Sequence, residues 1–503
     1  TGIDFDRARA LYQGSDHEIA VGAGQVEVSR CKLAGDRWTI QTLVEIPIAR
    51  DPPPRYKVRW DPAGSSRQGH RRFTIEATNG NRQSAAVKAA WSVKGSAVGG
   101  EMTQSGRRAL SGEFDAPRLD PGWHLLEVSV EAGDQGTMTL TEPFRWTPPE
   151  ASVREAWDYL TKSTIQGSPT LVSDRVYVGS FDGHVYALHA RTGRLIWKRS
   201  TQGSIFSTPT LADDSLLIGS MDHHLYCLDV RNGKVRWKYD TGAPIFASAA
   251  VSNGVACIGG NRTIHGVNMA TGTRIWSVPT GSFFQSRAAV SDGLFILGGW
   301  DNAVYAIRAS SGEIVWKHEM GRTQGGTGRL SFYYSPAITS PAIAHGRVYI
   351  CTNDGLLHCL RISDGEELWA VRAPSGSDTF GYSSPLVAQG KVFLGGLGES
   401  GRGNCYAINA DTGSLVWKAE TGADNYDSSP ALAGPWIVIG SVEGRITWLD
   451  PETGAVGHQY RLRPGYCFST PAGSPDLTMV TSMNGRITAL ITPRTSRNDG
   501  TGG

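Results

Sequence analysis

The 503-residue chain lacks several features that would assign it to a class of protein at once. No run of about 18 apolar residues occurs, so the sequence predicts no transmembrane helix. Lysine and arginine (49) almost balance aspartate and glutamate (47), so net charge gives no reason to expect nucleic acid or membrane insertion. The chain begins at Thr1, and the lack of a visible targeting segment therefore carries no information about compartment.

The seven cysteines form none of the patterns that hold metals or cofactors. No two are adjacent, and neither Cys-x-x-Cys nor Cys-x-x-Cys-His occurs, so a cysteine zinc site and an attached haem lack support. Cys227 and Cys359 occupy a small-residue position of the repeat described next, and we expect buried thiols that act as small hydrophobic side chains. A Gly-x-Ser-x-Gly nucleophile turn is also missing, and the catalytic residues stay unknown.

What the sequence does contain is a repeat of about 40 residues, present eight times between residues 154 and 492. In its clearest copy, residues 168–171, 175–180, 182–188 and 191–197 are short apolar segments separated by Gly- and Asp-containing turns. Such a copy predicts a four-stranded antiparallel sheet. Four strands per unit at this period are typical of a β-propeller.

One position, usually the proline of a Ser-Pro step, marks each copy and allows the units to be counted. These anchors are Pro169, Pro209, Ala249, Ala288, Pro341, Pro385, Pro430 and Pro471. The eighth unit ends without its outer strand, and residues 155–159 look like that strand. Closing the ring with it would remove two open sheet edges, so we predict an eight-bladed, self-closed propeller over 151–492, followed by a disordered tail at 493–503.

Residues 407–417 resemble the tryptophan-docking motif of quinoprotein-type (PQQ-like) propellers. That resemblance implies that Trp417 and its counterparts pack between neighbouring blades, and that the glycine allows the necessary turn. In the seventh unit, His458 stands where the tryptophan is expected. The family includes pyrroloquinoline quinone (PQQ) dehydrogenases, BamB-like outer-membrane assembly lipoproteins and members without known activity, so fold alone does not choose a function.

The first 150 residues predict two further β regions. Strands at 56–60, 73–77 and 126–130 alternate between apolar and polar residues, and the turn at 120–124 resembles bacterial immunoglobulin-like modules, which implies an Ig-like sandwich over 51–150. Residues 25–29 and 38–43 predict a hairpin within a segment at 1–50 that would belong to another domain. This domain order is similar to the C-terminal part of bacterial calcineurin-like metallophosphoesterases, whose metal-ligand motifs are absent here.

The sequence supports neither a PQQ site nor a metal site within the repeat. PQQ dehydrogenases, as a family, hold their cofactor between a tryptophan and a disulfide of adjacent cysteines, with calcium bound by Glu and Asn. No two cysteines of this chain are adjacent, so PQQ is disfavoured and no cofactor is predicted. The cluster Asp222-His223-His224 replaces an Asp-Gly-His turn of the first unit, and surface turn residues explain it without a metal.

A propeller usually binds its ligands in the funnel at one end of its channel, and the residues just before each anchor should line it. These positions vary between units but stay rich in aromatic residues, which favours stacking and hydrogen bonding, although aromatics that merely fill a narrow channel are the alternative. The candidates are Gln166, Phe206, Phe246, Phe284, Gln285, Arg287, Tyr333, Tyr334, Tyr382, Asn425, Asp427, Tyr466 and Phe468.

The sequence therefore predicts an all-β protein that acts as a non-catalytic binding platform for a protein or glycan partner at the funnel face. One alternative is the accessory portion of a metallophosphoesterase that associates with an upstream catalytic domain. The other is a carbohydrate-active propeller enzyme. The resemblance implies a bacterial, extracytoplasmic protein, periplasmic or secreted, while the ligand and the oligomeric state stay open.

Overall fold

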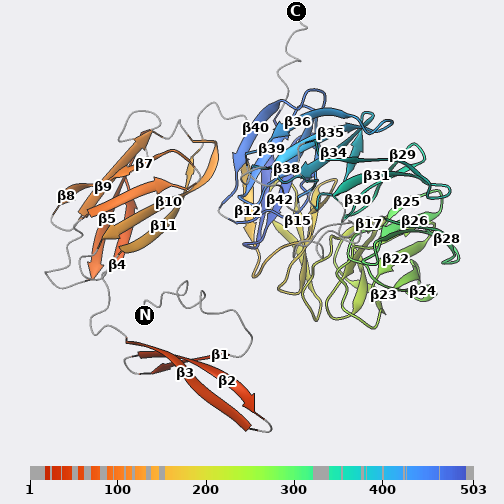
Figure 1. The fold of residues 1–503 in the computed structure, drawn as a ribbon, viewed down its shortest axis with the longest axis horizontal. Helices are drawn as coiled ribbons and strands as arrows, with labels where there is room; N and C mark the ends of the chain where they lie inside the picture. The colour runs from red at the N-terminus through yellow and green to blue at the C-terminus, as the bar shows by residue number, and fades with distance from the viewer. Residues whose placement is uncertain are drawn as a thin grey trace, which may run out of the picture. The chain divides into compact units, whose positions relative to one another are not determined.

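A computed structural model gives the fold of the chain (Figure 1). The structure describes residues 17–22, 25–34, 37–47, 55–61, 70–79, 88–94, 96–106, 109–115, 119–131, 137–146, 153–320, 339–352, 355–374, 379–380, 382–398, 402–422, 425, 428–463 and 465–493. Every regular element within these ranges is a β-strand, which confirms the all-β class. Over the same ranges, no helix is long and apolar enough to cross a membrane.

The chain divides into two compact units. The first comprises Thr1–Leu119 and His124–Phe144, and the second comprises Asp120–Trp123 and Arg145–Gly503. Within the first unit, β1 (His17–Gly22), β2 (Gln25–Ala34) and β3 (Arg37–Pro47) form a three-stranded antiparallel sheet. The expected hairpin corresponds to β2 and β3, and β1 adds a strand that the sequence pattern did not reveal.

The rest of the first unit is a two-sheet sandwich, with strands at all three sequence-predicted places. One sheet has the order β4-β5-β9-β8, while in the other β10 pairs with β6 and β11, and β6 pairs with β7. The strands are β4 (Arg55–Trp60), β5 (His70–Asn79), β6 (Lys88–Val93), β7 (Gly99–Glu101), β8 (Thr103–Gly106), β9 (Ala109–Asp115), β10 (Gly122–Glu131) and β11 (Thr137–Trp146).

Aromatic side chains from both sheets fill the sandwich core. Phe73 of β5 meets Trp91 of β6 edge to face with ring centroids 5.5 Å apart, and Phe114 of β9 lies 5.5 Å from Phe144 of β11. Buried and exposed residues alternate along β6, because successive side chains of a strand point to opposite faces of its sheet. The period-two pattern in the sequence thus has its expected physical cause.

The second unit is a β-propeller, and the described residues form eight four-stranded antiparallel blades. Blades one to four are β13 (Thr170–Val172), β14 (Arg175–Gly179), β15 (His184–His189), β16 (Leu195–Ser200); β17 (Thr210–Ala212), β18 (Ser215–Gly219), β19 (His224–Asp229), β20 (Val235–Asp240); β21 (Ala250–Ser252), β22 (Val255–Gly259), β23 (Asn261–Asn268), β24 (Arg274–Phe283); and β25 (Ala289–Ser291), β26 (Leu294–Gly298), β27 (Ala303–Arg308), β28 (Ile314–Glu319).

Blades five to eight follow the same order from the inner strand outward, and blade eight takes its outer strand from the start of the propeller. They are β29 (Ala342–Ala344), β30 (Arg347–Cys351), β31 (Leu356–Arg361), β32 (Glu367–Arg372); β33 (Leu386–Ala388), β34 (Lys391–Gly396), β35 (Asn404–Asn409), β36 (Leu415–Glu420); β37 (Ala431–Ala433), β38 (Trp436–Gly440), β39 (Arg445–Leu449), β40 (Val456–Arg461); and β41 (Ala472–Gly473), β42 (Leu477–Ser482), β43 (Arg486–Ile491) with β12 (Glu155–Leu160).

Closure of the ring by β12 confirms the sequence prediction. Trp157 pairs with Ala489 and Tyr159 with Ile487, so β12 adds antiparallel to β43 and completes blade eight. The second and third strands of each blade are almost continuously buried, because neighbouring blades cover both of their faces. Cys227 and Cys359 are fully buried among these strands, as expected for small hydrophobic side chains.

Docking tryptophans join the blades through a repeated contact. The indole N–H of Trp197 in blade one donates to the Val230 carbonyl of blade two over 3.1 Å, and the ring packs on Gly233. The same pair of contacts ties β12 to blade one, where Trp157 donates to Ala190 over 2.7 Å and packs on Gly193. Blade seven departs from the pattern: Trp436 of β38, rather than a residue of β40, donates to Pro493 over 2.8 Å.

Candidate channel site

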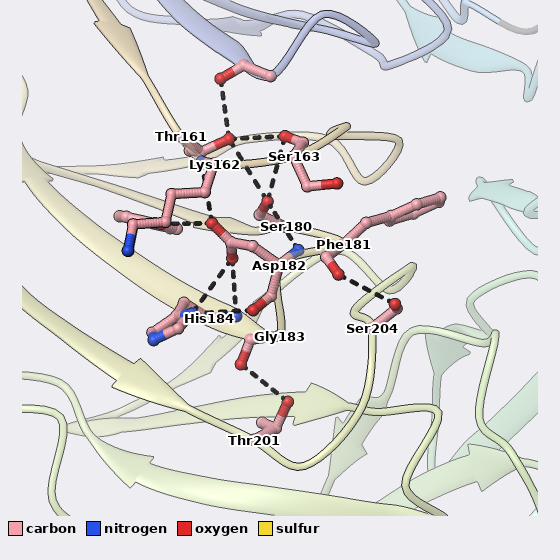
Figure 2. Close-up of polar contacts among 12 residues, drawn as sticks. Thr161, Lys162, Ser163, Ser180, Phe181, Asp182, Gly183, His184, Thr201 and Ser204 are labelled. Atoms are coloured by element: carbon pink, nitrogen blue, oxygen red, sulfur yellow. Dashed lines mark hydrogen bonds and ion pairs between the residues drawn. The ribbon is translucent and has the colours of Figure 1, made fainter. Parts of the chain in front are cut away.

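In blade one, an aspartate holds the turn between the second and third strands (Figure 2). The Asp182 carboxylate accepts hydrogen bonds from the backbone N–H groups of Lys162 and His184, both at 3.0 Å, and from the Tyr186 hydroxyl at 2.6 Å. Asp222 of blade two accepts the equivalent three bonds. The Asp-His turns therefore fasten blades one and two to the loops that precede them. Among the described residues, no three His, Cys, Asp or Glu side chains gather as a metal site would need.

The pKa of both aspartates reflects this structural role. Burial desolvates the Asp182 carboxylate and would raise its pKa, but the hydrogen bonds from Tyr186, Lys162 and His184 outweigh that effect and hold the pKa below the ordinary 3.8. The same balance lowers the pKa of Asp222. Because the folded state lowers these pKa values, the stability they contribute is present above pH 3.8 and is lost as the pH falls through the lowered values.

We expect Asp182→Asn to lower the free energy of unfolding by about 1–3 kcal/mol at pH 7, because donors of the turn lose their charged acceptor. The difference from the wild type should shrink at pH 3 and below, where the wild-type carboxylate is increasingly protonated. Urea unfolding at both pH values measures this, with Asp174→Asn as the control because its side chain is 66% exposed. A pH-independent difference would contradict the assignment.

The inner ends of the blades surround a cavity of about 400 Å³ on the propeller channel. Its lining comes from the residues one and three positions before each anchor, together with Gly167 and Ser286. Residues one position before the anchor are Ser168, Thr208, Ser248, Arg287, Ser340, Ser384, Ser429 and Thr470. Those three positions before it, among the described residues, are Gln166, Phe206, Phe246, Gln285, Tyr382 and Phe468.

Seven of the eight residues directly before the anchors carry hydroxyl groups, and these join blade to blade. The Ser168 N–H donates to Thr208 Oγ1 over 3.0 Å, and the Thr208 N–H donates to Ser248 Oγ over 2.8 Å. The link across the closure runs from the Thr470 N–H to Ser168 Oγ, 2.9 Å apart. Sequence reasoning missed this hydroxyl ring, although a column of Ser and Thr beside each anchor was visible in the repeat.

Arg287 interrupts the hydroxyl ring in blade four. Its backbone N–H donates to Ser340 Oγ over 3.2 Å, but its side chain offers no acceptor for the preceding blade. Arg287 is an exposed residue that lines the cavity, and the protein atoms around its guanidinium lower the pKa of that group by partial desolvation. Among the described residues, it has neither an ion pair nor a side-chain hydrogen bond.

An aromatic arc, defined as Phe181, Phe206, Phe246, Phe283 and Trp300, crosses blades one to four beside the cavity. Successive ring centroids are 4.1, 5.0, 5.5 and 6.2 Å apart. Phe206 and Phe246 line the cavity itself, while Trp300 is 40% exposed. Phe181, which carries the first ring, directly precedes Asp182 in the turn of blade one. The Ser204 hydroxyl donates to the Phe181 carbonyl over 3.0 Å and so helps to position this residue (Figure 2).

The predicted site residues divide into four groups, of which the last, Phe284 and Asn425, is described in the next paragraph. Those that line the cavity are Gln166, Phe206, Phe246, Gln285, Arg287, Tyr382 and Phe468. Tyr466 does not line it but is 58% exposed and stacks on Phe468 with the ring centroids 6.0 Å apart. Tyr333, Tyr334 and Asp427 lie outside the described residues.

Two predicted placements need correction. Phe284 is 1% exposed and packs against Tyr305 in the core between blades three and four, because it points opposite to its neighbour Phe283. Asn425 is fully buried, and its amide group exchanges hydrogen bonds with the Thr421 hydroxyl at 2.7 and 3.1 Å. Neither side chain lines the cavity.

The cavity does not fit the PQQ site that the family resemblance implies. Its described lining contains no tryptophan, no cysteine and no carboxylate. Six cysteines whose side chains the structure describes are separate, buried thiols, so none of these six forms a disulfide of adjacent residues: Cys227, Cys257, Cys351, Cys359, Cys405 and Cys467. The described lining therefore lacks the groups with which the PQQ dehydrogenases hold the quinone.

The closed ring of four-stranded blades and its docking tryptophans define a propeller of the PQQ type. BamB from Moraxella catarrhalis superposes with a TM-score of 0.55 at 17% identity, covering 68% of this chain and all of that structure. The quinohemoprotein alcohol dehydrogenase of Comamonas testosteroni superposes with a TM-score of 0.57 at 14% identity, covering 70% of this chain and 78% of that structure. At these identities, the likeness shows the fold alone.

Sequence comparison then identifies the family. The profile described as outer membrane protein assembly factor BamB matches residues 149–262, 260–428, 301–462 and 401–496, so the chain belongs to this family of PQQ-like repeat proteins. The outer membrane protein assembly factor BamB of Yersinia pestis is 23% identical over 193 residues. That match covers 38% of this chain and 46% of the relative, so the chain spans about half the length of this curated relative.

Proposed function

We propose that this chain is a non-catalytic scaffold that binds another polypeptide on the propeller face where the channel cavity opens. The observation that carries the proposal is the aromatic arc, a continuous row of rings across four blades that ends at a 40% exposed tryptophan. Large aromatic side chains are enriched in the centres of protein interfaces, since they bury much apolar area at low entropy cost.

The family supports the same function. Its profile and its relatives carry the name of an assembly factor for outer membrane proteins, which describes work on other polypeptides. Because these relatives are named for the assembly of outer membrane proteins, we also propose an extracytoplasmic location for this chain. The glycan partner, the carbohydrate-active enzyme and the metallophosphoesterase-associated portion stay predictions that no contact among the described residues favours.

A photo-crosslinking experiment in the native host tests the proposal. The photoreactive residue p-benzoylphenylalanine, placed at Trp300, should form an adduct with a discrete polypeptide, and the additional change Phe246→Glu should reduce the yield about tenfold or more. The matched control places the same photoreactive residue at Val235, which is 43% exposed on the outer strand β20. Equal adducts from both positions, or none from Trp300, would refute partner binding at the arc.

A further inference from the structure

Three polar side chains in the wall of the channel cavity have no partner within the propeller. The amides of Gln166 and Gln285 and the hydroxyl of Thr470 make no hydrogen bond to any of the described residues. All three residues keep part of their surface exposed, and unlike the enclosed Ser286 hydroxyl, their polar atoms are accessible from the cavity. An amide and a hydroxyl can each donate and accept, so these groups suit a ligand that offers both functions.

The hydroxyl ring supplies further donors to the same cavity. Six of its oxygens each accept a backbone N–H from the preceding blade, and they belong to Ser168, Thr208, Ser248, Ser340, Ser384 and Ser429. In the part of the chain that the structure describes, the protons of these six hydroxyls have no acceptor. A hydroxyl that accepts one hydrogen bond can still donate its own proton, so the ring can donate to a group that occupies the cavity.

Aromatic rings form a second layer of the cavity wall. Phe206, Phe246 and Phe468 stand three positions before their anchors, whereas the hydroxyl ring stands one position before them. Each inner strand begins directly after its anchor, so the rings lie on the loop side of the cavity and the hydroxyls lie on the strand side. A group that enters from the loops therefore meets an apolar layer first and a polar layer beyond it.

These two layers select the chemistry of the occupant. A volume of about 400 Å³ lies near the small end of ligand pockets and admits a side chain rather than a folded segment. An aliphatic or phenylalanine side chain would bury the polar groups of the wall without giving them a hydrogen-bond partner, which is costly. A lysine or arginine would find no carboxylate in the described lining. A tyrosine side chain has an apolar ring with a polar tip and so matches both layers.

We infer that the partner polypeptide inserts a tyrosine side chain into the channel cavity. The ring packs on the phenylalanines, and the phenolic hydroxyl exchanges hydrogen bonds with the hydroxyl ring and the glutamine amides. The inference rests on the proposed function and deepens it, because Phe206 and Phe246 belong both to the aromatic arc and to the cavity wall. A polypeptide bound along the arc would therefore lie beside the cavity.

Saturation-transfer NMR titrations of the full chain test this with the blocked peptide acetyl-Ala-Tyr-Ala-amide and three rival probes. The tyrosine peptide should bind with a Kd of about 1 mM or below. The matched peptide acetyl-Ala-Phe-Ala-amide should bind at least about tenfold more weakly, because a site with free polar groups rejects a ligand that lacks the hydroxyl. The aspartate peptide and methyl α-glucoside, which represent a carboxylate and a glycan, should also bind at least about tenfold more weakly than the tyrosine peptide.

Variants of the cavity wall separate binding from folding. Gln285→Leu should weaken binding of the tyrosine peptide about tenfold without weakening the phenylalanine peptide, so the preference between them should narrow. Thr470→Val should weaken the tyrosine peptide several-fold without lowering the melting temperature, because its hydroxyl has no internal partner. Ser248→Ala should lower the melting temperature, because its oxygen accepts from the Thr208 N–H. Gln202→Leu is the matched control and should change neither property, because Gln202 is exposed outside the cavity lining.

Failure of this inference is distinguishable from failure of the proposed function. A specific adduct from Trp300, combined with no preference for the tyrosine peptide or an unchanged preference in Gln285→Leu, would overturn the tyrosine inference and leave partner binding intact. Tyrosine-peptide binding without any adduct from Trp300 would refute the partner and the inference that rests on it. Binding that arises only after Tyr333→Ala or Tyr334→Ala would mean that a tyrosine of this chain occupies the cavity, and would also overturn the inference.

Discussion

Replacing Trp436 by alanine is expected to lower the free energy of unfolding by about 3–5 kcal/mol, the largest effect among the substitutions considered. Trp436 is 8% exposed and packs against His458 edge to face, with the ring centroids 5.1 Å apart. Gly457 leaves the space that the indole ring occupies, since a Cβ there would lie 2.4 Å from it. The alanine variant would leave a cavity at the junction of blades seven and eight.

Trp436→Phe separates packing from hydrogen bonding at this junction. It keeps most of the apolar contact but removes the donor to the Pro493 carbonyl, so a smaller loss of about 1–3 kcal/mol is expected. Trp300→Ala is the control, because Trp300 is 40% exposed and surface changes usually stay within about 0.5 kcal/mol. Urea unfolding monitored by circular dichroism measures all three. A loss for Trp436→Ala no larger than the control would show that this residue does not dock blade eight.

Substitution of Gly193 by alanine should weaken the closure of the ring. Gly193 has φ +66°, and a Cβ there would lie 2.7 Å from the ring of Trp157, the docking residue of β12. The left-handed conformation costs about 1–2 kcal/mol for alanine, and the clash adds about 1–3 kcal/mol of overpacking.

Gly254 provides a matched control for this prediction. It has φ +76°, but a Cβ there would meet nothing within 4 Å, so Gly254→Ala should cost only the backbone term. Thermal unfolding of the two variants side by side measures the difference. Equal losses would mean that the Trp157 contact contributes nothing to closure.

Much of the propeller could be read from the residues of a single repeat. Apolar segments such as 175–180 and 182–188 are separated by turn residues, and this local pattern predicts strands and hairpins without knowledge of the ring. The missing outer strand of the eighth copy and the extra strand at 155–159 together predicted closure, which the pairing of β12 with β43 confirms. Open sheet edges are prone to aggregation, so proteins usually cover them. The incomplete eighth copy and the spare strand at 155–159 would each leave such an edge, and pairing the two removes both.

The site was only partly visible in the sequence. Position relative to the anchor predicted that Phe206, Phe246 and Arg287 would come together, and they line one cavity. It could not tell Phe283 from Phe284, because which of two adjacent rings faces the core depends on the backbone direction at the end of β24. Nor could it show that Ser286 lacks a partner, since that depends on how blade four packs.

The order of residues within each repeat was sufficient to determine the strands, because these follow from hydrophobic periodicity and turn residues a few positions apart. The number of copies then predicted the number of blades, and the incomplete eighth copy with the spare strand at 155–159 predicted the closure of the ring. Only the tertiary structure decided that Trp436 replaces the docking residue of blade seven, and that hydroxyl groups beside the anchors link blades as far apart in the sequence as Thr470 and Ser168. Such contacts join residues from distant blades, and they exist only after long-range packing has closed the ring.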